Sequence, residues 1–107
     1  METLRDQPFR PVIGATKSVS ATTSSASASL NAATVDTSII NPCVRVHNAG
    51  SNTAFVRWGE GSQTATTSDL PIPSGGIEVF VKNKADTVAA ICATGTATVY
   101  FTPGNGF

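Results

Sequence analysis

The 107-residue chain has few charged side chains and few residues that usually carry chemistry. Only 13% of its residues are charged, and seven basic residues balance seven acidic ones, whereas about a quarter of residues are charged in typical domains. A neutral chain with so few Lys and Arg residues lacks the positive patch that binds DNA or RNA. It also lacks the basic cluster that binds anionic membranes. We therefore expect neither a nucleic acid nor a membrane among its partners.

We also expect neither a targeting segment nor a membrane-spanning segment in this sequence. The uncharged stretch 18–35 consists mostly of Ser, Thr and Ala, a composition that does not form a transmembrane helix. The first fourteen residues include no apolar segment of the kind found in signal peptides. These features predict a soluble intracellular protein.

Histidine and cysteine are too sparse to indicate a reactive site. His47 is the single histidine, and Cys43 and Cys92 lie 49 positions apart, which matches no metal-binding spacing. In a reducing compartment we expect two free buried thiols rather than a disulfide. The seven carboxylates are scattered, and nothing in the sequence supplies a nucleophile and an orienting acid for His47. We expect no enzyme activity, no metal, no cofactor and no small-molecule substrate.

Alternation of apolar and polar residues dominates the rest of the chain and predicts β-strands. Val44 and Val46 point inward, and Ala97, Val99 and Phe101 share one face. Residues 17–30 are read either as a linker or, as we prefer, as two strands joined by a hairpin turn. The segments with strand patterns are 43–47, 53–58, 63–67 (the weakest), 77–81, 87–93 and 96–102, with a hairpin turn at 48–52, a loop at 69–76 and a link at 94–95.

These short strands, separated by turns at roughly ten-residue intervals, predict the fold class. No window of the sequence has helical periodicity with capping residues. The apolar residues of 87–93 occupy both faces, as in a central strand. We predict an all-β protein with a single antiparallel β-sandwich over residues 16–107, jelly-roll or immunoglobulin-like, with seven or eight strands.

Residues 1–15 differ from the rest and form a separate region. They contain four of the fourteen charges and two prolines, but no strand or helix period. One interpretation is a disordered terminus. The other is an extended arm on a neighbouring subunit, in which Phe9, Val12 and Ile13 are apolar anchors and Arg5 and Arg10 are candidate contacts.

Three further residues are candidates for a partner-binding surface. Arg57 and Trp58 are adjacent in a strand, so they point to opposite faces. We expect Trp58 inside, next to Val56, because the reverse orientation would bury the Arg57 guanidinium, which then needs a partner such as Glu60 or Glu78. Whichever of the two is exposed is the candidate anchor, since both residue types dominate interface hot spots. Phe80 has the opposite parity to Ile77, Val79 and Val81, so it either faces outward as a contact or occupies a core position.

Taken together, several segments resemble small virion proteins of tailed bacteriophages and prophages. The resemblance lies in the stretches VRVHNAGSNTAFVRWG, TATTSDLPIPSGG and IEVFVKNKADTVAAICATGTATVYFTPGNG. It extends over 18–107 as a pattern of turns and apolar positions. It implies a β-sandwich that serves as a capsid decoration, or cement, protein on the outer surface of the virion.

The function implied by this resemblance is binding to the major capsid protein lattice and stabilisation of the head. Self-association as a dimer or trimer would multiply a modest affinity on a repeating shell. Two alternatives stay open: a head-fibre base, connector or tail component, and a carbohydrate- or receptor-binding module.

Overall fold

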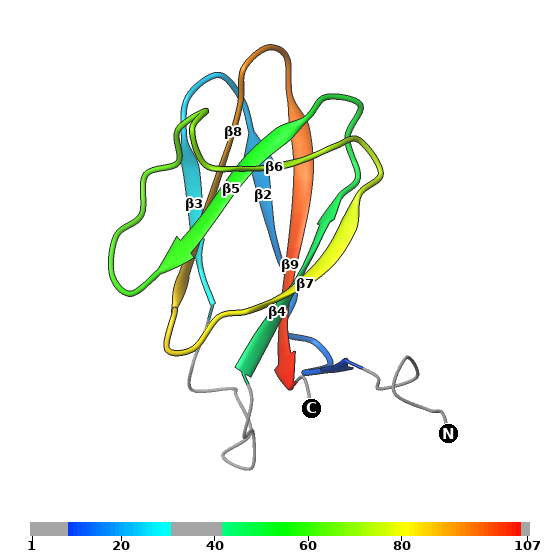
Figure 1. Ribbon diagram of the computed structural model, residues 1–107, viewed down its shortest axis with the longest axis vertical. Coiled ribbons are helices and arrows are strands. Elements are labelled where there is room, and N and C mark those ends of the chain that lie inside the picture. Colours follow the sequence, from blue (N-terminus) through cyan, green and yellow to red (C-terminus); the bar gives the residue numbers. More distant parts are fainter. Residues whose placement is uncertain (1–8, 31–41, 106–107) are drawn as a thin grey trace.

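The chain folds into two antiparallel β-sheets that pack as a sandwich (Figure 1). The computed structural model describes residues 9–30 and 42–105, and within them every regular element is a strand. Sheet A contains β1 (Arg10–Pro11), β2 (Lys17–Ala21), β4 (Pro42–Asn48), β7 (Ile77–Val81) and β9 (Ala97–Asn105). Sheet B contains β3 (Ala26–Ser29), β5 (Ala54–Gly59), β6 (Leu70–Ile72) and β8 (Thr87–Cys92). The predicted all-β sandwich is confirmed, with nine strands in the described residues instead of seven or eight.

Each sheet is organised around its longer strands. In sheet A the order is β1-β9-β4-β7, and β2 pairs with another part of β9. Opposite residues on β4 and β9, such as Val46 and Phe101, share a face. In sheet B the order is β3-β8-β5-β6. The central place predicted for residues 87–93 is confirmed, because β8 lies between β3 and β5, and Ala89 and Ala90 are both fully buried.

The core lies between the sheets and is filled mainly by small side chains. Strand alternation sends one set of residues inward, as predicted for Val44 and Val46. The buried cluster consists of Val19, Ala21, Leu30, Val44, Val46, Ala54, Val56, Ile72, Val88, Ala90, Cys92, Ala97, Val99 and Phe101. Cys43 and Cys92 are buried free thiols, as the sequence predicted.

The connections between strands differ from the prediction. Strands β2 and β3 belong to different sheets, so the segment 22–25 is a bridge between layers and the predicted hairpin is wrong. The turn after β4 likewise passes from sheet A to sheet B, so the hairpin predicted at 48–52 is also wrong. Of the eight connections between successive strands of the described residues, six join one sheet to the other. Residues 63–67 form no strand, whereas Leu70–Ile72, within the predicted loop, pairs with β5 at the edge of sheet B.

Candidate binding surface

Exposed apolar side chains gather on the outer side of sheet A. Among the described residues, Ile77, Val79 and Val81 on β7 are 50%, 45% and 53% exposed, and Tyr100 on β9 is 40% exposed. The register aligns Ile77 with His47, and His47 with Tyr100. Directly opposite residues of neighbouring strands point to the same face, so these side chains lie on one surface.

This surface, which we call the sheet A face, extends across three strands. Val79 lies opposite Arg45 on β4, and the rings of His47 and Tyr100 are 6.2 Å apart between centroids. The sheet A face therefore consists of Ile77, Val79 and Val81 on β7, Arg45 and His47 on β4, and Tyr100 on β9. His47, which the sequence placed at a strand end beside a turn, lies within β4 and contacts an aromatic ring.

The orientation of β7 follows from the packing of Phe80. Its ring lies 5.0 Å from the ring of Trp58, and both side chains pack against the core. Of the two alternatives left open for Phe80, the outward position is wrong and the core position is confirmed. Because neighbours on a strand point to opposite faces, Ile77, Val79 and Val81 must then face solvent.

Arg57 and Trp58 lie as expected on opposite faces of β5. Trp58 is half-buried beside the core, and Val56 is fully buried. Arg57 is exposed on the outer side of sheet B, where its Nη1 donates to the Thr64 carbonyl at 3.2 Å and lies 3.9 Å from an Asp69 carboxylate oxygen. An exposed ion pair of this kind contributes little to stability.

The described part of the arm lies against its own domain. Arg10 and Pro11 pair with Asn105 and Gly104 of β9, and the Val12 N–H donates to Pro103. A Cβ at Gly104 would meet the Phe9 ring at 2.6 Å, so Phe9 lies directly over this glycine.

Ile13 follows β1 in a tight turn and is the most exposed apolar residue described, at 88%. The turn is closed by the Ala15 N–H donating to Val12, and Gly14 has a positive φ of 87°. The candidate Arg5 lies outside the described residues. Phe9 through Ile13 are therefore brought together beside β9, whereas Arg57, Trp58 and Phe80 belong to other parts of the sandwich.

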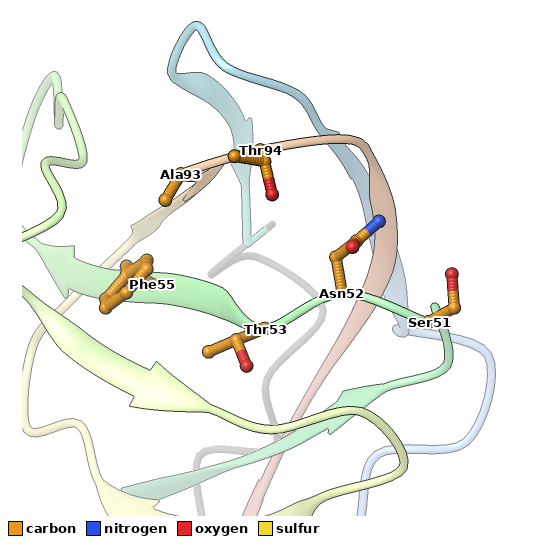
Figure 2. A pocket seen from close by; sticks show the side chains of 6 residues that line it. All are labelled: Ser51, Asn52, Thr53, Phe55, Ala93 and Thr94. Carbon is orange, nitrogen blue, oxygen red and sulfur yellow. The ribbon is translucent and has the colours of Figure 1, made fainter.

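An open hollow lies where β5 begins and β8 turns into β9 (Figure 2). It has a volume of about 420 Å³ and is lined by Ser51, Asn52, Thr53, Phe55, Ala93 and Thr94. The lining combines hydroxyl groups with a single aromatic ring. The Asn52 amide already donates to the Thr96 carbonyl at 2.9 Å.

Two buried groups have shifted pKa values. Burial lowers the pKa of the Lys82 ammonium, although Asp86 and Cys43 oppose the shift; Lys82 Nζ donates to the Ala85 carbonyl at 2.9 Å. Burial raises the pKa of the Cys92 thiol, which therefore stays protonated.

In the described residues no group of three or more His, Cys, Asp and Glu side chains could hold a metal ion. The same residues contain no helix with the length and apolarity needed to cross a membrane.

The sequence predicted the shared face of Ile77, Val79 and Val81 but did not identify it as the exposed one. All the residues of β7 except Glu78 are apolar, so alternation could not separate core from surface. The signal that could have identified the buried face was the size of Phe80, because a large ring gains more from burial than a valine side chain does.

Comparison with known protein families and with curated proteins found no match for this chain.

Proposed function

We propose that the chain is a bacteriophage virion structural protein that decorates and stabilises the head by binding the outer surface of the major capsid protein lattice. The observation that carries the proposal is the sheet A face, where four large apolar side chains are 40–53% exposed on a sheet. Apolar surface of this kind marks protein interaction sites. The resemblance to small phage virion proteins supplies the class of partner.

The shape of the molecule fits passive adhesion to a lattice. A sandwich presents its outer side chains at fixed positions, so little conformational entropy is lost when the sheet A face docks. The low charge of the chain, 13% with a net charge of zero, limits repulsion between copies packed on one shell. Repetition around the shell then turns a modest affinity into stable coverage.

Binding to heads that lack the protein tests this proposal. We expect the purified chain to co-sediment with heads of the source phage, and Tyr100→Glu to weaken binding roughly tenfold or more, as for an aromatic contact residue that carries much of the binding energy. Leu70→Glu is the matched control, because Leu70 is also 40% exposed but lies on β6 of sheet B. No co-sedimentation, or equal weakening by both variants, contradicts the proposal.

Subunit counts in a map of the particle separate a decoration protein, with hundreds of copies, from a connector or tail component, with roughly a dozen.

The hollow in Figure 2 favours a second candidate function, a carbohydrate-binding module. Aromatic rings beside hydroxyl and amide groups are typical of small-ligand pockets, but among the described residues Phe55 is the only ring in the lining. A glycan screen tests this candidate. Binding that is lost in Phe55→Ala and kept in Tyr100→Glu supports it over capsid decoration.

A further inference from the structure

Strand β7 is an exposed sheet edge without the usual protection. Among the described residues it pairs with β4 alone. Edge strands are usually blocked by proline, by lysine or by bulges, because unpaired backbone groups attract another strand. The sequence of β7, Ile-Glu-Val-Phe-Val, contains no proline and a single charge, Glu78.

The backbone of β7 directs three residues toward this open edge. The Lys82 N–H donates to Pro42 and the Asn48 N–H donates to Gly76, each at 3.0 Å, at the two ends of the β4–β7 ladder. Hydrogen-bonded residues alternate along an antiparallel strand. Glu78 and Phe80 therefore also bond toward β4. The N–H and C=O groups of the intervening Ile77, Val79 and Val81 point away from the sheet.

We propose that β7 pairs antiparallel with β7 of a second copy of this chain, about a two-fold axis at Val79. Val79 then lies opposite Val79 of the second copy, and Ile77 lies opposite Val81. In this register all three outward-pointing residues exchange both hydrogen bonds with the second copy, and sheet A continues across the two molecules.

Charge selects this register over its neighbours. A two-fold axis at Glu78 would place two carboxylates directly opposite each other, which is destabilising. An axis at Phe80 would leave Ile77 unpaired. With the axis at Val79, Glu78 of each copy lies opposite Phe80 of the other, so no two carboxylates are directly opposed.

The edge is self-complementary, which favours a second copy over an unrelated partner. Five paired residues per copy bury less than the roughly 1,200 Å² of a stable interface. The dimer therefore forms at high protein concentration and dissociates on dilution. It places Ile77, Val79 and Val81 of both copies side by side, which doubles the apolar strip of the sheet A face. The pairing uses backbone groups and does not depend on capsid binding.

Cysteine cross-linking tests the register. Val79→Cys would meet its own counterpart with Cα atoms about 5.5 Å apart, within the range of a disulfide, so we expect disulfide-linked dimers under mild oxidation. Tyr100→Cys is the matched control, with similar exposure on the same face but away from the edge. The native Cys43 and Cys92 are buried, so the wild type should form no disulfide-linked dimers under the same conditions. Equal cross-linking of Val79→Cys and Tyr100→Cys would overturn the proposal.

A backbone variant tests the hydrogen bonds. Val79→Pro removes an N–H that points away from β4, a position where an edge strand tolerates proline. Sedimentation of the wild type at rising concentration should show a monomer–dimer equilibrium. The variant should weaken dimerisation roughly 30-fold, the equivalent of two lost backbone hydrogen bonds. Circular dichroism checks that the variant is folded. A wild type that stays monomeric near millimolar concentration, or a folded Val79→Pro that dimerises equally well, refutes the proposal.

Discussion

At the scale of single residues, Asn48 joins parts of the chain that are distant in sequence. Its side chain is fully buried at the end of β4. The Asn48 amide donates to the carbonyls of Asn52 at 2.8 Å and Ile72 at 2.9 Å, and its Oδ1 accepts from the Gly50 N–H at 2.9 Å. One side chain thus satisfies three buried or half-buried backbone groups, and it fixes the turn after β4 against β6.

Replacing this side chain should be costly. Asn48→Ala leaves its three partner groups without their hydrogen bonds, and each unsatisfied buried group costs about 1–3 kcal/mol. We expect the free energy of unfolding in urea to fall by roughly 2–4 kcal/mol. Ser74→Ala is the control: it removes one exposed hydrogen bond to Gly50 and should cost less than about 1 kcal/mol. A similar loss in both variants would show that Asn48 has no special role.

The buried Cys92 thiol makes stability depend on alkaline pH. Burial raises its pKa above the ordinary value of 9.0, so the folded chain holds this proton to higher pH than the unfolded chain does. The thiol's contribution to the free energy of unfolding is fully present below pH 9.0 and decreases as the pH rises beyond it. In Cys92→Ala this decrease should disappear.

Urea unfolding in a reducing buffer, from pH 7.5 upward, measures this difference. At neutral pH the variant should be less stable by about 1 kcal/mol, because it loses buried volume. The gap should narrow above pH 9.0. The lowered pKa of Lys82 makes stability rise with pH, which is the opposite dependence. Because Lys82 is present in both proteins, its contribution cancels in the difference between their free energies of unfolding. Parallel stability curves for the two proteins would contradict the prediction.

At the scale of strands, alternation predicted most elements but not how they connect. The strands around Val44, Val56 and Phe101 were found because a two-residue period marks a half-buried strand. The same period holds whether the next strand pairs in the same sheet or crosses to the facing sheet, because either arrangement buries one side. Six crossing connections were therefore beyond prediction from pattern alone.

The candidate surface could be predicted only in part, for a related reason. The sequence identified Arg57 as exposed and Trp58 as inward. It could not tell which face of β7 is buried, because that depends on the contact between Trp58 and Phe80 across the two sheets. A contact between residues 22 positions apart cannot be predicted from a two-residue period, which reflects only the order of neighbouring residues.

The short strand β1 should be held in place by the absence of a side chain at Gly104. A methyl group there would strike the Phe9 ring, so we expect Gly104→Ala to displace β1 from β9. Amide hydrogen exchange at Val12, whose N–H donates to Pro103 at 2.9 Å, should accelerate roughly tenfold or more. Phe9→Ala should have a similar effect. Ile13→Ala, at an exposed position, should leave the exchange rate at Val12 unchanged, and a comparable acceleration there would argue against this docking.

At the scale of the whole molecule, the two outer sides of the sandwich differ. On the outer side of sheet B, Arg57 donates a hydrogen bond to the Thr64 carbonyl. The N–H of the neighbouring buried residue Ala65 donates to the Ser25 hydroxyl at 2.8 Å. The loop after β5 therefore covers part of that side. The sheet A face has no such cover from the described residues around β7, and its apolar side chains are available to a partner.

If the sheet A face binds the capsid, its effect should be measurable in whole particles. Heads without the protein should release their DNA at a lower temperature, detected with a DNA-binding dye during heating, because each bound copy adds a contact that the shell repeats many times. Adding the wild-type chain or Leu70→Glu should restore the release temperature, whereas Tyr100→Glu should restore it only at higher concentration. Equal release temperatures with and without bound wild-type protein would mean that the chain is displayed on the head without strengthening it, because the free energy of its binding would then not oppose the separation of capsid subunits.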